Sequence, residues 1–546
     1  MTCPRALPLV LALSFLSALA ACSGGAKGAD PASRTGLGRP LSAAPARGLA
    51  ASADGAWLAW LEGCTEVRGR YLPPGTSSCE LKVGATAPGA ATPVTVARAV
   101  TSLAQGLTFA PEGHLLAALA EYDYEAGAGT LVLVEDGAAR TVAAGVTFHA
   151  FLPAGAGGGA VLLAVAGGQL LAVPTAGAPR KIPGAGGVAT FDLAPAPWAG
   201  REVAALARRP VAAGGGLLAL GPALDQARPV ASGTSEFGLA PGDGWAFTAV
   251  ARSGAERAPF PRWSSARLAS GARTFAFARD GAALAWVSDA APGKQGDLQV
   301  AKVGGAPELL GREVGEHRWA AGAARLAWLE RYDPRTRTGV LGAGGPGRAP
   351  RTFGRAVSDF EISPDGGHLA FLRHTTEGGY SVDLELAAVD GAAPAAAPFA
   401  GGADPTPPAP APAATRKVAR GVFGFAFSPD SRWLYYRTRC TRQAEACDLE
   451  RVAVEAAPGA AAEELAKGIK SFEFDPRDPG RLLVTWQRAD LVALDLATWQ
   501  AGKLLAVDQG ALAGSIRFLG PDSRRLAYAV VQPRRAGIYL ADLPGP

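Results

Sequence analysis

A short phrase built around a tight turn recurs along the chain and constrains its fold more than any other feature. The clearest copies are Phe360–Phe371 (FEISPDGGHLAF) and Phe425–Tyr436 (FAFSPDSRWLYY). Each copy reads as an apolar strand, a turn of Pro, Asp and Gly or Ser, and a second strand that alternates apolar and polar residues. Weaker copies occupy 52–60, 109–117, 275–286 and 518–528. Repetition at a period of about 40–47 residues predicts a blade-type repeat protein.

The residues of the phrase suit a turn. Pro presets φ, Asp accepts hydrogen bonds from nearby backbone N–H groups, and Gly tolerates a positive φ. Ser431 and Ser523 replace Gly in two copies, which predicts that these turns need less of that freedom. We interpret the aspartates as turn caps rather than as catalytic or metal-binding groups. The tryptophans of the second strands are interpreted as packing residues: Trp57, Trp60, Trp286, Trp328, Trp433 and Trp486.

The phrase resembles the WD40-like propeller repeat of the TolB and tricorn type, in which this turn joins the first two strands of a four-stranded blade. In that repeat an apolar run ending in Asp-Gly or similar forms the third strand. Such runs lie at 130–134, 297–303, 382–389, 490–496 and 538–543. The resemblance covers most of the chain from about residue 46 and implies an all-β fold of four-stranded antiparallel propeller blades. It implies no activity, because one fold carries many functions.

The number of blades follows from landmarks in the first strands. We count about eleven: Ala51, Phe109, Phe148, Phe191, Phe237, Phe275, Trp319, Phe360, Phe425, Phe472 and Phe518. Because propellers usually have four to eight blades, we expect two propellers, at 46–270 and 271–546, with the Pro/Ala-rich stretch 392–414 as a surface loop. Seven plus four blades, or a single eight-bladed ring, are alternatives. Leu41–Leu49 is a candidate for the fourth strand that the last blade lacks.

The first residues read as an export signal. Arg5 precedes an apolar run, and residues 1–21 end in small residues before Cys22, which resembles a bacterial lipobox. The resemblance implies cleavage before Cys22, acylation of its thiol and a membrane anchor, with 22–45 as a flexible tether. Ser23 favours the periplasmic side of the outer membrane. The formal charge after cleavage is 52 − 48 = +4, and without a basic run among aromatics we expect no nucleic-acid partner.

The remaining cysteines form two close pairs. Besides Cys3 in the signal and Cys22, the chain has Cys64 with Cys79, and Cys440 with Cys447. An even set at short spacing in an exported protein predicts two disulfides. Each pair brackets the loop between the second and third strands of a blade.

No motif identifies a catalytic or cofactor site, and we expect no cofactor or metal. The sequence has no nucleophile elbow and only five His. The leading hypothesis is a non-enzymatic, membrane-anchored envelope lipoprotein that binds a protein or peptide. The alternative is an envelope enzyme or small-ligand binder, such as a glycan lyase, with a site in the propeller channel. Candidate binding residues in the loops between second and third strands are Arg70, Tyr71, Tyr122, Tyr124, Arg331, Tyr332, Arg335, Arg337, His374, Tyr380, Arg439 and Arg442.

Overall fold

All regular elements of the described residues are β-strands that pair antiparallel, which confirms the expected all-β fold. The structure is a computed structural model. It describes residues 38–69, 72–103, 107–153, 159–194, 201, 203–210, 215–232, 234–239, 244–249, 254–259, 266–267, 272–288, 295–302, 305–375, 381–390, 414–441, 446–475, 477–487, 493–500, 503–512, 514–520, 524–530 and 535–543. The Pro/Ala-rich stretch falls almost wholly outside these ranges.

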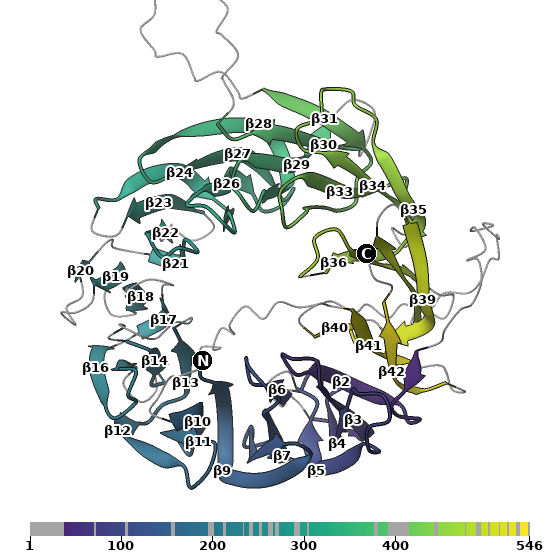
Figure 1. The fold of residues 1–546 in the computed structure, drawn as a ribbon. Coiled ribbons are helices and arrows are strands. Elements are labelled where there is room, and N and C mark those ends of the chain that lie inside the picture. The colour runs from purple at the N-terminus through teal and green to yellow at the C-terminus, as the bar shows by residue number, and fades with distance from the viewer. Residues whose placement is uncertain are drawn as a thin grey trace, which may run out of the picture. The chain divides into compact units, whose positions relative to one another are not determined.

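Four strands, which we call A to D, form the repeating blade (Figure 1). The A strands are β2 (Ala46–Ala51), β6 (Leu107–Phe109), β9 (Ala138–Phe151), β13 (Thr190–Leu193), β17 (Thr234–Leu239), β21 (Ala272–Phe277), β25 (Glu316–Trp319), β28 (Arg348–Ile362), β32 (Phe425–Phe427), β36 (Ser471–Phe474) and β40 (Arg517–Leu519). The B strands are β3 (Trp57–Glu66), β7 (Leu116–Asp123), β10 (Ala160–Ala166), β14 (Ala205–Arg208), β18 (Gly244–Ala249), β22 (Ala283–Ser288), β26 (Leu326–Asp333), β29 (His368–Thr375), β33 (Trp433–Thr438), β37 (Leu482–Gln487) and β41 (Arg525–Val530).

The outer half of each blade consists of strands C and D. The C strands are β4 (Ser77–Ala85), β8 (Ala128–Glu135), β11 (Gln169–Pro174), β15 (Gly216–Leu220), β19 (Gly254–Pro259), β23 (Gly296–Lys302), β27 (Thr338–Gly345), β30 (Ser381–Ala388), β34 (Cys447–Ala453), β38 (Ala493–Gln500) and β42 (Gly537–Asp542). The D strands are β5 (Val94–Thr101), β12 (Arg180–Gly186), β16 (Ala227–Ser232), β20 (Ala266–Arg267), β24 (Glu308–Val314), β31 (Thr415–Arg420), β35 (Glu463–Ile469), β39 (Lys503–Leu512), the first halves of β9 and β28, and β1 (Arg39–Pro40).

The described residues therefore make eleven blades of a β-propeller fold, numbered here from the N-terminus. Every first-strand landmark, from Ala51 to Phe518, lies in an A strand. The repeated turn located these strands even where its sequence is degraded, because the aromatic or apolar residue before the turn is retained.

Apolar side chains fill the gaps between successive blades. Ala59 of blade 1 packs in one cluster with Leu116 of blade 2, and Leu384 of blade 8 packs with Leu434 of blade 9. Three tryptophans of the B strands are fully buried, as their interpretation as packing residues predicted: Trp60, Trp286 and Trp328. Trp60 and Trp328 pack in clusters shared with a neighbouring blade. Sheet-on-sheet burial of this kind is the main source of stability for the fold.

Strand β1 closes the last blade from the N-terminal side. Arg39 and Pro40 pair with β42, and the N–H of Leu41 donates to the carbonyl of Ile538. The candidate Leu41–Leu49 is thus wrong in its bounds, because most of that range precedes or forms strand A of blade 1. The end of the expected tether, from residue 38 to 45, is built into the propeller.

The blades follow one another without a break near residue 270. Strands β18 and β19 of blade 5 pack against β21 of blade 6, and β2 of blade 1 packs against β40 and β41 of blade 11. Residues Thr35–Pro546 form one compact unit. The described blades therefore pack in one continuous series, and the division into two propellers at 46–270 and 271–546 stays a prediction. Within the described ranges, the structure contains no helix with the length and apolar character of a membrane span.

Candidate binding face

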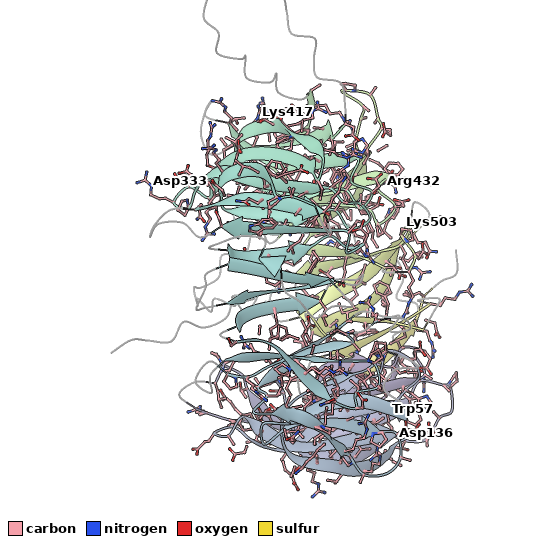
Figure 2. The ribbon with its side chains drawn as sticks, turned by 90° about the vertical axis from the view of Figure 1, so that its left-hand side faces the viewer. Trp57, Asp136, Asp333, Lys417, Arg432 and Lys503 are labelled. Carbon is pink, nitrogen blue, oxygen red and sulfur yellow. A yellow bond between two sulfur atoms is a disulfide. The ribbon has the colours of Figure 1, made fainter. Side chains whose placement is uncertain are left out.

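Each blade has two ends with different connections. The A–B turn and the C–D turn lie at one end, whereas the B–C loop and the connection to the next blade lie at the other. We call the second surface the B–C face and the first the A–B face. Figure 2 shows Asp333 of a B–C loop on one side and Arg432 of an A–B turn on the other. Trp57 and Asp136, which belong to the A–B ends of blades 1 and 2, lie on the side of Arg432.

The A–B turns share one hydrogen-bond pattern. The Asp365 carboxylate accepts hydrogen bonds from the Ser363 hydroxyl at 2.6 Å and from the Gly367 N–H at 2.9 Å. The same bonds recur around Asp54 and Asp430. Although partial burial acts to raise the pKa of Asp365, these bonds hold it below its usual range. The aspartates are turn caps, as the sequence indicated.

One expectation for these turns is wrong. Ser431 has a φ of +62°, close to the +74° of Gly366, so its turn needs the same left-handed conformation. That conformation costs a residue with a Cβ about 1–2 kcal/mol. The hydroxyl of Ser431 accepts a hydrogen bond from the N–H of Asp365 in the preceding blade at 3.1 Å, and this bond offsets part of the cost. Ser523 lies outside the described residues.

Arginines on the A–B face join neighbouring blades. Arg525 of blade 11 donates to the hydroxyl of Thr86 in blade 1 at 3.1 Å, and Arg279 of blade 6 donates to the carbonyl of Ala321 in blade 7 at 3.2 Å. These side chains support the packing of the blades, so they are poor choices for a neutral control on this face.

The B–C loops begin in a shared way. A residue with positive φ stands in the last part of strand B in blades 1, 2 and 7, and directly after strand B in blade 9: Gly63, Glu121, Arg331 and Arg439. In the first three the register shifts at this point, which is a β-bulge. A bulge bends the strand and increases its twist. The loops that follow are therefore directed by the backbone and not only by their own contacts.

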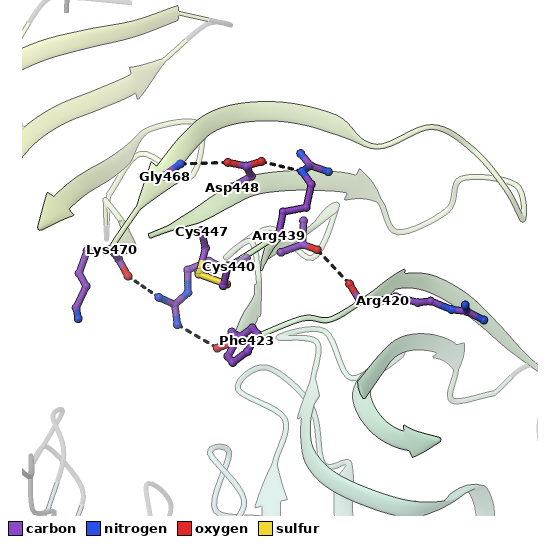
Figure 3. The surroundings of a disulfide bond; sticks show 10 residues. Arg420, Phe423, Arg439, Cys440, Cys447, Asp448, Gly468 and Lys470 are labelled. Atoms are coloured by element: carbon purple, nitrogen blue, oxygen red, sulfur yellow. Dashed lines mark hydrogen bonds and ion pairs between the residues drawn. A yellow bond between two sulfur atoms is a disulfide. The ribbon is translucent and has the colours of Figure 1, made fainter. Parts of the chain in front are cut away.

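Both predicted disulfides are present. Cys64 bonds to Cys79 with the Cα atoms 4.1 Å apart, and Cys440 bonds to Cys447 with the Cα atoms 4.0 Å apart. Each joins the end of strand B to strand C of one blade and closes the base of a B–C loop, as shown for the second pair in Figure 3.

Arg439 beside the second disulfide is engaged in ion pairs. It contacts Asp448 at 2.7 Å, as Figure 3 shows. It also pairs with Glu464 at 2.8 Å and with Glu450. The hydrogen bond to Asp448, followed by that to Glu450, raises the pKa of the guanidinium. Arg439 was a candidate binding residue, but the structure assigns it to the support of strands C and D.

The candidate tyrosines are half-buried supports. Tyr124 donates its hydroxyl proton to the carbonyl of Ser77 at 2.8 Å, and its ring meets the edge of Tyr122 with centroids 5.0 Å apart. The ring of Tyr332 covers Gly315, where a Cβ would stand 2.3 Å from Tyr332 Cδ1. These rings hold the loops on the blades and leave little area for a partner.

Three candidate arginines of blade 7 project into solvent. Arg331, Arg335 and Arg337 are exposed. Their loop is fixed by Asp333, whose carboxylate accepts the N–H of Arg335 at 2.8 Å and whose carbonyl accepts the N–H of Arg337 at 2.8 Å. The bond from Arg335 holds the pKa of Asp333 below its usual range. Among the described residues, no side chain forms an ion pair or hydrogen bond with the three guanidinium groups.

Some predicted residues cannot be placed. Those outside the described ranges are Cys22, Arg70, Tyr71, Tyr380 and Arg442. His374 of blade 8 lies half-buried on β29 opposite Val382.

The sequence argument missed a second group of basic residues at this face. Arg312, Arg355 and Arg420 are exposed. The residue after each has a positive φ, which is +51° after Arg312, +56° after Arg355 and +63° after Arg420. The signal in the sequence is a tetrapeptide of Gly or Ala, Arg, any residue and Val, at 311–314, 354–357 and 419–422. It was overlooked because strand D lies outside the repeated turn.

Polar side chains of the A strands reach the next blade. Arg318 donates to the carbonyl of Phe360, and the carboxylate of Glu361 accepts the N–H of Phe427 at 3.4 Å. Burial raises the pKa of Glu361 to about 7, against the opposite effects of the Phe427 N–H and of Arg318. These side chains satisfy backbone groups at the open edge of the A strands of blades 8 and 9.

The same region holds the charges that a channel site would use. Arg318 pairs with Glu316 at 2.5 Å and with Asp359 at 3.3 Å. Burial lowers the pKa of His317. Glu316 and Asp359 thus both form ion pairs with Arg318. Within the described ranges no group of three or more His, Cys, Asp or Glu is placed to hold a metal ion.

Comparison with known proteins yields only distant similarities. No family model and no curated protein matches the sequence. Among solved structures, the crystal structure of the tricorn protease has a TM-score of 0.31 and 11% identity, over 91% of this chain and 57% of that chain. A eukaryotic initiation factor gives 0.34 and 14%, over 71% and 94%. A structure from a study of two prolyl endopeptidases gives 0.31 and 14%, over 57% and 50%. We draw no functional argument from values this low; the fold rests on the strand pairing above.

Proposed function

We propose that this protein is a non-enzymatic scaffold of the cell envelope, anchored in the membrane through acylated Cys22, that binds a protein or peptide on its B–C face. The observation that carries the proposal is the B–C loop of blade 7, which presents Arg331, Arg335 and Arg337 to solvent from a fixed backbone. Arginine is enriched among the residues that dominate binding energy at protein interfaces. A loop already held in shape loses less entropy on binding.

The exported location has separate support. Two disulfides at the bases of B–C loops suit an oxidising compartment. The small residues before Cys22 and the apolar run that they end favour lipid attachment. An anchored protein without a catalytic centre would act by holding a partner at the membrane.

The test uses the full-length lipoprotein in its own cells. We expect the amount of partner recovered by cross-linking to fall at least about tenfold in the variant Arg331→Gln/Arg335→Gln/Arg337→Gln. Removing a hot-spot side chain typically costs 1 kcal/mol or more of binding free energy. Tyr332 stays unchanged because its ring is packed. The matched control is Arg432→Gln on the A–B face, where Arg432 is 81% exposed.

Two results would contradict the proposal. If the triple variant and the wild type recover equal amounts of the partner, the partner does not bind through the arginines of the B–C face. Retention of a Cys22→Ala variant in the membrane fraction at the wild-type level would refute the anchor while leaving the binding face open to the first test.

A further inference from the structure

Six arginines project from the B–C face of three successive blades. Strand β24 of blade 6 packs against β26 of blade 7, and β28 belongs to both blades 7 and 8, so the side chains lie on adjoining elements. We call them the arginine surface: Arg312, Arg331, Arg335, Arg337, Arg355 and Arg420. Each is exposed. Arg420 also lies 3.7 Å from Asp383 but remains 78% exposed, and its side chain extends away from the disulfide in Figure 3.

The acids at this end of the blades differ in exposure, and Asp297, Glu330 and Asp333 are half-buried. Asp383 and Glu385 of β30 are buried, and Lys417 and Arg373 pair with them. Glu313 is an exposed acid beside Arg312. The fully exposed charges described at this end of blades 6 to 8 are therefore mainly guanidinium groups.

The backbone explains why these arginines project. Arg312 and Arg355 each precede a left-handed residue in a D-strand bulge, and Arg420 ends β31 before Gly421. The bulge leaves one residue unpaired and turns the strand away from its neighbour. A left-handed residue directly after the arginine thus recurs in blades 6, 7 and 8, and one basic side chain per blade lies along the rim of the B–C face.

We propose that the partner of the B–C face binds the arginine surface through an extended segment rich in Asp and Glu, which lies across the D strands of blades 6 to 8. The inference rests on the proposed function and names its partner class. Guanidinium groups bind carboxylates in a bidentate fork, which a Lys ammonium cannot do. One arginine per blade, with the loop of blade 7 between, fits a linear chain of carboxylates better than a single anion.

The entry of the N-terminal segment argues against anionic lipid as the ligand. Because β1 runs antiparallel to β42, Gly38 lies at the A–B end of blade 11, and Arg39 donates to the carbonyl of Thr86 at 2.8 Å at the A–B end of blade 1. A tether from Cys22 thus joins the propeller on the A–B face. The arginine surface is on the opposite face from this point of entry.

The chain supplies its own matched control. The tetrapeptide occurs again in blade 1 at 97–100, with Arg98 at the basic position, and a variant of it occurs in blade 9 at 466–469, with Lys467 in place of Arg and Ile in place of Val. These side chains lie near carboxylates, Arg98 at 3.8 Å from Glu80 and Lys467 at 3.3 Å from Glu464. Variants Arg98→Gln/Lys467→Gln therefore change the same strand position on the same face, outside the arginine surface.

The experiment measures fluorescence anisotropy of a labelled Glu/Asp-rich peptide of about twelve residues, long enough to cross neighbouring strands at about 3.4 Å per residue. We expect saturable binding to the wild type and no binding of a Gln/Asn-substituted peptide. Arg312→Gln/Arg355→Gln/Arg420→Gln should weaken binding at least about tenfold, whereas the control pair should stay within about twofold. Raising the salt to about 0.5 M should weaken wild-type binding as charges are screened.

Several outcomes overturn the inference. The inference is refuted if the wild type does not bind the acidic peptide. It is also refuted if the Arg312→Gln/Arg355→Gln/Arg420→Gln triple variant binds the peptide as tightly as the wild type does. The inference also fails if the wild type binds polyphosphate, or vesicles containing anionic lipid, more tightly than the acidic peptide and the triple variant loses that binding. The ligand would then be phosphate. If the Arg331→Gln/Arg335→Gln/Arg337→Gln variant loses its cross-linked partner while the acidic peptide does not bind the wild type, the scaffold function stands and only this inference fails.

Discussion

Backbone groups at the open edge of each A strand need partners, because buried N–H and C=O groups are rarely left unpaired. Side chains from the adjacent blade supply some of them. Arg318 and Glu361 reach forward to the next A strand, and the indole N–H of Trp319 reaches back to the carbonyl of Ala276 at 3.1 Å. Such residues look like a charged active site in the sequence of a propeller, but here they join blades.

Glu361→Gln should stabilise the protein at high pH and leave it unchanged in acid. The pKa of Glu361 is raised to about 7 from 4.5, so between these values the folded protein holds a proton that the unfolded chain releases. Stability therefore falls as pH rises through this window. At about 1.4 kcal/mol per pKa unit, the gain above pH 8 is at most about 3.5 kcal/mol, and the amide still accepts the Phe427 N–H.

Denaturant unfolding near pH 4, 6 and 8 measures this difference. Glu473, at the same position of strand A in blade 10, is exposed, and Glu473→Gln serves as the control. A stability gain of Glu361→Gln that is the same at all three pH values would exclude burial of a charge as its cause.

Among the elements, the A–B turn is the one that local sequence specifies best. Its Ser, Asp and Gly residues make bonds within six residues, so the pattern can be read without tertiary information. Ser431 shows the limit of that reading, because its left-handed backbone is supported by Asp365 of another blade. The bulges of the D strands were missed for the same reason: pairing with strand C, and not a turn motif, determines where they occur.

Gly366→Ala should destabilise the protein more than Gly113→Ala. Both glycines have positive φ, +74° and +68°, so each alanine has the cost of a left-handed residue, about 1–2 kcal/mol. A Cβ on residue 366 would also stand 2.7 Å from Cγ of Arg325 in the neighbouring blade, whereas one on residue 113 meets nothing within 4 Å. Thermal unfolding of the two variants compares them, and equal losses would show that Arg325 moves aside without cost.

The sequence predicts the parts of the molecule better than their assembly. Each of the eleven A strands and both disulfides follow from local patterns, as do the exposed arginines of the blade 7 loop. The roles of Arg439 and Tyr332 depend on partners in other strands, which no linear motif shows. The number of propellers depends on which blades pack together, and the closing strand β1 is only two residues long.

Removal of β1 should destabilise the molecule as a whole. Tyr528 of β41 donates its hydroxyl proton to buried Asp508 at 2.6 Å, and Arg535 pairs with the same carboxylate at 3.0 Å. Gly38 covers this group so closely that a Cβ would lie 2.5 Å from the Tyr528 hydroxyl. A chain shortened to begin at residue 45 loses that cover, and it also exposes the edge of β42 to pairing with other molecules.

We expect that chain to lose about 3 kcal/mol or more, the usual cost of disrupting a buried ion pair, and to aggregate. Thermal unfolding and size-exclusion chromatography compare it with a chain that begins at residue 38, which keeps β1 and should match one that begins at residue 22 with Cys22→Ser. If the chain that begins at residue 45 unfolds at the same temperature as the longer ones and stays monomeric, the last blade is stable with three strands. Residues 38–44 would then rest on the propeller without stabilising it, and their place on the A–B face would carry no argument about the ligand of the arginine surface.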